Sequence, residues 1–192
     1  GGNNILIRDL ETNDSTQITK EKDLQTAFAD WTQDGDYIIT AKGRRNLKLY
    51  MYHKDGGSGI KLIDKPSSIK ITQPMVGSND RYIWYAHRTS SWQYNARFPQ
   101  YQISKFDRET GEIKRETSRF GSAFTPTLSP DGKWLVYGTR YEDKTALRIR
   151  DLKTGDERWL AYPVQKDDQE SQATMGVLPN MSFTPDSQNL IA

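Results

Sequence analysis

Apolar and polar residues alternate along many short stretches of this chain. In residues 147–150, the apolar side chains of Leu147 and Ile149 alternate with two arginines, and residues 47–53 repeat the pattern. A period of two places successive side chains on opposite faces and is typical of β-strands with one face buried. The pattern therefore predicts an all-β protein built from short strands.

Two kinds of turn separate these stretches and occur in alternation. The first is a polar turn that enters an apolar strand, as in "SPDGKWLVY" at 129–137, with relatives at 32–40, 77–85 and 184–192. The second reads Asp-x-x-Thr-Gly, as in "IRDLKTGD" at 149–156, with relatives at 7–14, 51–59 and 105–112. Glycine is favoured in such turns because it accepts a positive φ without steric cost. We expect Gly35, Gly132 and Gly155 to lie at hairpin bends.

The turns recur at a nearly constant interval. Tyr37 and Tyr82 are 45 residues apart, and Pro130 and Pro185 are 55 residues apart. A period of about 40–50 residues with four strands per unit is typical of a β-propeller. Counting the strands between the turns predicts two strands, then three complete units of four, then two more strands.

We therefore predict a partial β-propeller with three complete four-stranded blades plus two half-blades at the termini. The limits that we expect are a half-blade at 1–23, blades at 24–70, 71–122 and 123–176, and a half-blade at 177–192, all in a single domain. Such a chain begins and ends inside a blade. We expect a fragment of a longer protein, with Gly1 and Gly2 as native turn residues; the alternative is that the two glycines are a cloning remnant.

A split blade leaves strand edges with unpaired backbone groups, which invite pairing. The two halves could pair within one chain and close a four-bladed ring, two chains could exchange halves, or the fragment could remain an open arc. We expect the arc, together with self-association through the half-blade edges.

Composition narrows the range of partners. The chain of 192 residues has 27 basic and 25 acidic residues, a net charge of +2, and its basic residues are scattered, so we expect no nucleic-acid partner. It contains no run of about 18 apolar residues that would predict a membrane span. The absence of cysteine excludes a disulfide framework and thiolate–metal sites. Its first residues show no signal-peptide pattern.

Two groups of residues carry a family resemblance. "SPDGKWLVY", followed by "LRIRDLKTGDERWL", resembles the TolB-like repeats, relatives of WD-repeat propellers. More narrowly, residues 93–112 and 157–171 resemble the propeller region that precedes the catalytic domain of large exported amidohydrolase-type proteins. The resemblance implies a periplasmic or secreted location and contact with a downstream catalytic domain or a partner protein. The second repeat departs from the pattern, with "SND" in place of "PDG" and an insertion before its third strand.

Catalytic and metal-binding motifs are sparse. Amidohydrolases hold metal with a His-x-His pair, whereas the two histidines here, His53 and His87, lie in different repeats. The chain has no Gly-x-Ser-x-Gly motif, no Walker loop and no Gly-x-Gly-x-x-Gly. Because His53 stands where other repeats have aspartate, we expect it to hydrogen-bond a turn. We predict no catalytic residue, no metal ligand and no cofactor in this chain.

The insertion in the second repeat is the candidate binding surface. The stretch from His87 to Gln102 is rich in aromatic and arginine side chains, which stack on sugars, bases or a partner protein. The candidate partner or ligand residues are Trp92, Tyr94, Arg97, Phe98, Tyr101 and His87. The alternative is a long hairpin loop that packs its own aromatics against a neighbouring blade. Residues 166–171, "KDDQES", are either a solvated loop or the edge of a binding surface.

Three functions fit these features. The first is a non-catalytic propeller module that serves as a scaffold, docking or gating domain of a larger bacterial hydrolase. The second is a periplasmic propeller that binds partner proteins through its loops. The third is a propeller-channel enzyme that acts on oligosaccharides with a metal ion, a reading that requires several channel-lining histidines or carboxylates. Two separated histidines favour the first function over the third.

Overall fold

The computed structural model describes residues 3–44, 46–64, 69–88, 100–142, 144–166 and 180–192. Within these ranges the chain forms sixteen β-strands, β1 to β16, and no helix. All strand pairs in these ranges are antiparallel. The same part of the chain holds no helix long and apolar enough to cross a membrane. The all-β class predicted from the period-two pattern is confirmed.

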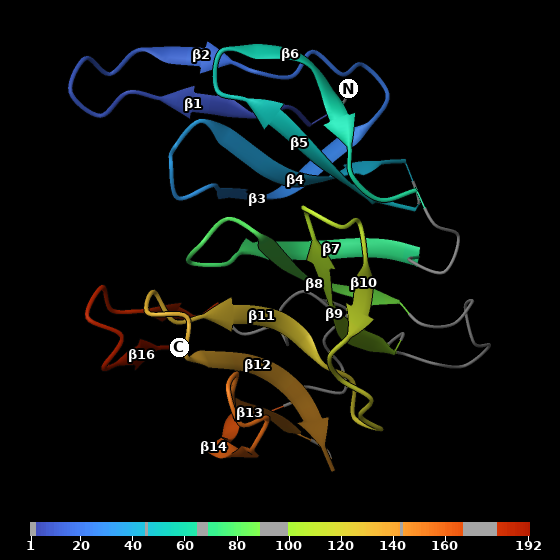
Figure 1. Cartoon of the computed structure of the whole chain (residues 1–192), viewed down its shortest axis with the longest axis vertical. Helices are drawn as coiled ribbons and strands as arrows, with labels where there is room; N and C mark the ends of the chain where they lie inside the picture. Colours follow the sequence, from blue (N-terminus) through green and yellow to red (C-terminus); the bar gives the residue numbers. More distant parts are fainter. Residues whose placement is uncertain (1–2, 45, 65–68, 89–99, 143, 167–179) are drawn as a thin grey trace.

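Three four-stranded sheets form the complete blades, and each strand pairs with its neighbours in sequence (Figure 1). The first blade contains β3 (Gln25–Trp31), β4 (Tyr37–Gly43), β5 (Lys48–His53) and β6 (Gly56–Lys61). The second contains β7 (Ile69–Val76), β8 (Tyr82–Arg88), β9 (Tyr101–Asp107) and β10 (Ile113–Arg115). The third contains β11 (Phe124–Leu128), β12 (Trp134–Tyr141), β13 (Lys144–Asp151) and β14 (Glu157–Lys166). This arrangement confirms the three predicted blades.

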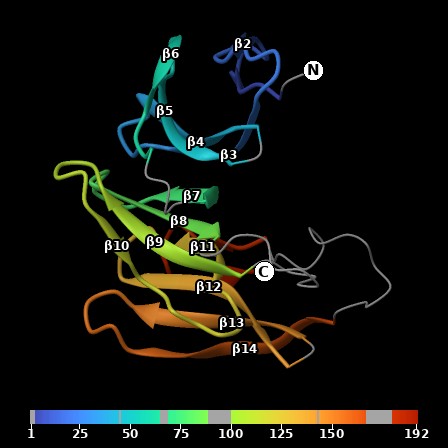
Figure 2. The ribbon, with the colours of Figure 1, turned by 90° about the vertical axis from the view of Figure 1, so that its right-hand side faces the viewer.

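The half-blades are two separate two-stranded sheets. One pairs β1 (Leu6–Arg8) with β2 (Ser15–Gln17), and the other pairs β15 (Ser182–Phe183) with β16 (Leu190–Ile191). The first half-blade packs on the first blade and the second packs on the third blade, so the blades are stacked in an open series (Figures 1 and 2). The described strands therefore form an arc rather than a closed four-bladed ring.

Each blade has two apolar faces because side chains alternate along its strands. In β8, Ile83 and Tyr85 join a buried cluster with Ile39 of the first blade. Trp84, the residue between them, points the other way and joins a buried cluster with Leu135 of the third blade. Burial of each such side chain contributes about 1.5–3 kcal/mol. The core of the protein is therefore the series of interfaces between blades.

The predicted turns are present at the hairpin bends. Gly35, Gly132 and Gly155 have φ of 73°, 71° and 81°, the left-handed region that favours glycine. In the second kind of turn, Asp151 accepts hydrogen bonds at Oδ1 from the backbone N–H groups of the second and third residues after it. The same geometry recurs at Asp9 and Asp107.

The first complete blade replaces the turn aspartate with His53. Its Nδ1 accepts a hydrogen bond of 3.2 Å from the backbone N–H of Asp55. An imidazole nitrogen thus takes over the acceptor role of the aspartate side chain in the other turns. The structural role expected for His53 is confirmed.

The first strand of every complete blade contains a bulge that the turn patterns did not predict. Phe28, Gln73 and Thr125 have φ of 59°, 51° and 51°, and the pairing with the second strand shifts at each of them. A left-handed backbone costs about 1–2 kcal/mol at a residue with a side chain. Hydrogen bonds between two of these residues offset part of that cost. The Gln73 side chain accepts from the Thr125 N–H at 2.9 Å and donates to the Thr125 hydroxyl at 3.1 Å. The bulges of β7 and β11 therefore link the first strands of the second and third blades.

Candidate functional site

The sequence-predicted surface lies only partly within the described residues. His87 and Tyr101 belong to β8 and β9, on either side of the insertion. The other four candidates lie outside the described residues: Trp92, Tyr94, Arg97 and Phe98. Residues 167–171 of the predicted "KDDQES" segment also lie outside them.

His87 is buried inside the second blade, with 8% of its surface exposed. Its Nε2 forms a hydrogen bond of 2.8 Å with the hydroxyl of Ser104, and its Nδ1 lies 3.2 Å from the carbonyl oxygen of Arg88. Burial lowers the pKa of the imidazole below its ordinary value. The His87 ring therefore joins β8 to β9 from within and is not part of the exposed surface.

Tyr101 connects the second blade to the loop that enters the third blade. Its backbone N–H donates to the hydroxyl of Ser122 at 3.2 Å, and its carbonyl accepts from the N–H of Ala123 at 2.8 Å. The Tyr101 side chain is half-buried, and burial raises its pKa. Tyr101 thus positions the loop of residues 116–122, which crosses between the two blades.

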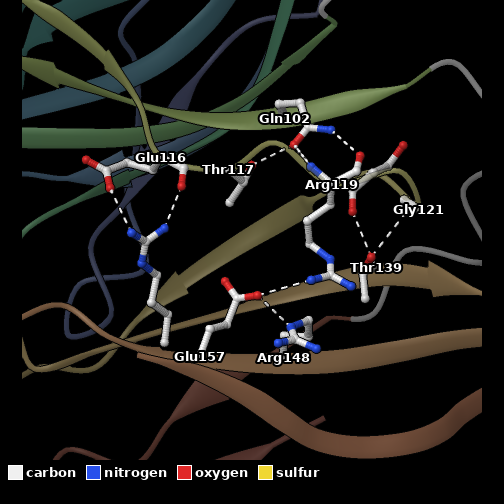
Figure 3. A network of polar contacts seen from close by, with 10 residues as sticks. Gln102, Glu116, Thr117, Arg119, Gly121, Thr139, Arg148 and Glu157 are labelled. Carbon is white, nitrogen blue, oxygen red and sulfur yellow. Dashed lines mark hydrogen bonds and ion pairs between the residues drawn. The ribbon is translucent and has the colours of Figure 1, made fainter. Parts of the chain in front are cut away.

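A buried polar network holds this loop at both ends (Figure 3). Gln102, 2% exposed, accepts from the Thr117 hydroxyl at 2.9 Å and donates to the Arg119 carbonyl at 2.6 Å. At the other end, the Gly121 carbonyl accepts from the Arg140 N–H at 2.7 Å and from the Thr139 hydroxyl at 3.2 Å. Because both ends are fixed, the side chain of Arg119 is directed toward the third blade.

Arg119 meets a carboxylate that it shares with a second arginine. Oε1 of Glu157 accepts from Nη1 of Arg119 at 3.2 Å and from Nε of Arg148 at 2.6 Å (Figure 3). Burial, followed by the adjacent Glu157 carboxylate, raises the pKa of the Tyr137 phenol well above its ordinary value. The group carries two positive charges and one negative charge at neutral pH. It therefore leaves one positive charge beside the surface that it supports.

Trp159 lies over this group and contacts two other exposed aromatic side chains. We call the three the aromatic surface: Tyr141, Trp159 and Tyr162. They are 46%, 40% and 41% exposed. The ring centroids of Tyr141 and Trp159 are 5.1 Å apart, and those of Tyr141 and Tyr162 are 5.5 Å apart. The guanidinium carbons of Arg148 and Arg119 lie 4.5 and 5.5 Å from the Trp159 ring centroid, within cation–π range. The buried network thus fixes the orientation of an exposed aromatic cluster.

The sequence reasoning did not identify the aromatic surface. Its signal was the segment "ERWLAYPV" at 157–164, whose apolar residues do not alternate with polar ones as they do in the other strands. The predicted insertion begins and ends at Arg88 and Gln100, and Arg88 pairs with Tyr101 in the sheet. Gln100 donates to the Phe120 carbonyl at 3.5 Å, next to Arg119, which contacts the Trp159 ring of the aromatic surface. The ends of β8 and β12 lie on one side of the molecule (Figure 2). The described part of the insertion and the aromatic surface therefore share one end of the propeller.

The chemistry available to this arrangement is binding through exposed aromatic rings, guanidinium groups and a carboxylate. Among the described residues, no group of three or more histidines or acids could hold a metal ion. His53 lies in a hairpin turn and His87 within a blade, so the structure does not bring the two histidines together.

No family model matches the chain. A curated protein of Sulfurisphaera tokodaii, named as a Tricorn-like protease C-terminal subunit, is 29% identical to this chain over 147 residues. The aligned region covers 71% of this chain and 16% of that protein. The chain thus spans only a small part of the curated relative that it matches.

Solved structures share the fold over nearly the whole chain. TolB from Acinetobacter baumannii has a TM-score of 0.75 and 21% identity, covering 97% of this chain and 42% of that chain. An oligogalacturonate lyase in complex with manganese has a TM-score of 0.68 and 19% identity, covering 95% and 48%. A prolyl endopeptidase has a TM-score of 0.61 and 16% identity, covering 80% and 25%. The fold of this chain is that of a TolB-like β-propeller, as its repeats predicted.

Proposed function

We propose that this chain is part of a non-catalytic propeller module that serves as a scaffold, docking or gating domain of a larger exported hydrolase. The observation that carries the proposal is the aromatic surface at the outer edge of the third blade, held in place by the buried network beneath it. Exposed aromatic and arginine side chains framed by polar groups are typical of protein–protein contacts. The partner that we propose is the catalytic portion of the parent protein.

Two of the comparisons support attachment to a hydrolase. The Tricorn-like protease subunit and the prolyl endopeptidase are named for proteolysis and match this chain over 16% and 25% of their lengths. These relatives favour a peptidase as the parent, whereas amidohydrolase chemistry stays a prediction from the sequence. The resemblance to TolB-like repeats supports the exported location that we propose. The blade limits at 24, 71, 123 and 177 are part of the same proposal.

The proposal is tested by measuring association between this chain and the separately produced catalytic portion of its full-length gene product. We expect Trp159→Ala to weaken association by roughly 30-fold, the effect of losing an aromatic hot spot worth about 2 kcal/mol. Trp31→Ala is the matched control, because Trp31 is 42% exposed but belongs to the first blade. Equal affinities for the two variants would contradict docking through the aromatic surface.

A propeller-channel enzyme acting on oligosaccharides is the second candidate, favoured by the likeness of fold to the oligogalacturonate lyase. It predicts that the purified chain takes up Mn²⁺ and cleaves oligogalacturonate with a rise in absorbance from the unsaturated product. A chain that neither binds Mn²⁺ nor depolymerises the sugar excludes this candidate. The docking proposal does not depend on that result. The remaining candidate function is the binding of a separate periplasmic protein. A pull-down with the same Trp159→Ala variant tests it.

A further inference from the structure

The outermost strand of the third blade differs from those of its neighbours. β14 has 10 residues, whereas β2 and β10 have 3 residues each and β6 has 6. β6 also carries three glycines in the sequence "GGSGIK". Short outer strands present few backbone groups to another chain, which is one way in which natural sheets limit pairing at their edges. β14 is not shortened in this way, and among the described strands it pairs with β13 alone. Pro163 and two register shifts interrupt its edge, but the other residues of β14 still offer more backbone groups than the shorter outer strands do.

β14 also exposes apolar side chains. Trp159, Leu160 and Val164 are 40%, 36% and 36% exposed. The pairing of β14 with β13 skips Leu160, which therefore lies at a bulge. A strand laid along β14 would cover these apolar side chains while pairing its backbone. Strand addition to an exposed sheet edge combines these two kinds of contact.

The charges beside β14 favour an acidic partner. Arg119 and Arg148 contact the Trp159 ring, and Lys144 lies 5.9 Å from the Tyr162 ring centroid. Two acids accompany these three cations: Glu157, shared by the arginines, and Glu142, which accepts from the Tyr162 hydroxyl at 3.3 Å. Arg158, an exposed residue of β14, is a fourth cation, so the balance among these residues is two positive charges. Complementary charge across an interface selects the partner and speeds association.

We propose that β14 accepts an extended peptide segment as a fifth strand of the third blade. The peptide would carry apolar side chains on the face toward Trp159 and at least one carboxylate toward Arg119 and Arg148. This inference rests on the proposed docking function and specifies how the partner binds. Backbone pairing along β14 supplies affinity, and the aromatic surface with its arginines supplies selectivity.

The probe is the ten-residue peptide VTVTETVTVT, whose valines and central glutamate share one face, because Arg148 and Trp159 stand opposite each other in the sheet and also share a face. Two variants are N-methylated at every odd or every even residue. Alternate N–H groups of an extended strand point to opposite edges, so N-methylation of one set blocks pairing with β14 and the other set is harmless. We expect one N-methylated peptide to bind at least about tenfold more weakly and the other to bind like the parent peptide. Binding should also slow hydrogen exchange of the Leu160 and Val164 amides.

Four outcomes would overturn strand addition: no binding of the parent peptide, equal binding of the three peptides, unchanged exchange along β14, or equal binding of a peptide with lysine in place of the glutamate. If single-stranded DNA competes with the peptide equally well, the site binds polyanions in general, and strand addition is overturned as well. Trp159→Ala should weaken peptide binding and Trp31→Ala should not. Equal binding of the three peptides, combined with weakened association of Trp159→Ala with the catalytic portion, would refute strand addition and leave the docking function standing.

Discussion

Gly121 is the residue at which the network is most sensitive to one added methyl group. A Cβ built on Gly121 lies 1.9 Å from the carbonyl oxygen of Arg140, whereas ordinary contact begins at 3.4 Å. The Gly121→Ala variant must therefore separate the loop of residues 116–122 from β12 by more than 1 Å. That movement breaks the hydrogen bond of 2.7 Å from the Arg140 N–H to the Gly121 carbonyl, and the bond of 3.2 Å from the Thr139 hydroxyl.

The loss of stability follows from these contacts. Two hydrogen bonds contribute about 1 kcal/mol each, and residual crowding adds to their loss, so we expect Gly121→Ala to lower the free energy of unfolding by about 2–3 kcal/mol. For a domain of this size that corresponds to a fall in Tm of about 5–10 °C. Urea unfolding with an unchanged m-value, or calorimetry, measures the difference.

Gly111→Ala is the matched control. Gly111 has φ of 73° but nothing lies within 4 Å of its Cβ position, so the cost is the left-handed backbone alone, about 1 kcal/mol. Because Gly121 positions Arg119 beneath the aromatic surface, Gly121→Ala should also weaken binding there, while Gly111→Ala should not. If Gly111→Ala destabilises the chain as much as Gly121→Ala, the reasoning from the close approach of Arg140 is wrong.

Three further predictions concern the turns, the bulges and the edges. The pKa of Asp107 is lowered from 3.8 to about 2, first by its hydrogen bonds with Arg81. The ionised Asp107 carboxylate therefore stabilises the folded chain fully above pH 3.8, the pKa of the unfolded chain, and this stabilisation is lost as the pH falls toward 2. Asp107→Asn should therefore cost more stability than Asp151→Asn at pH 7, and urea unfolding should show the gap narrowing below pH 4; a gap that is constant with pH contradicts this. Gln73→Ala should lower the free energy of unfolding by about 1–2 kcal/mol, because the left-handed Thr125 loses two hydrogen bonds, and an unchanged urea midpoint would argue against the clasp between blades. β1 and β16 are sheet edges, so the isolated chain should self-associate with rising concentration in analytical ultracentrifugation, and a monomer at every concentration would speak against edge pairing.

Much of the fold was determined by short stretches of sequence. Glycines such as Gly132 and Gly155 lie at the bends because the left-handed backbone of each turn depends on the residue itself. The turn aspartates bond to backbone N–H groups two and three residues later, so their geometry is local as well. His53 could be interpreted correctly for the same reason, since its place in the repeat defines its acceptor role. Blade number followed from counting these local signals.

The candidate site was beyond the reach of such signals. The network joins Gln102 of the second blade, Arg119 of the crossing loop and Glu157 of the third blade, residues that come together only when two blades stack. Blade stacking also brings Gly121, which no turn pattern marks in the sequence, close to the Arg140 carbonyl oxygen. Gly111, which lies in a recognisable turn, has open space at its Cβ position.

Sequence by itself determined where this chain turns, how many strands it has and how they group into blades, because turn geometry and period-two alternation are settled by residues close together in the chain. Tertiary structure decided which side chains meet between blades and which remain exposed. His87 is buried although it borders the insertion, and Trp159 is exposed although it lies in a strand. The physical reason is that burial depends on the face of the neighbouring blade, which is contributed by residues about one repeat away.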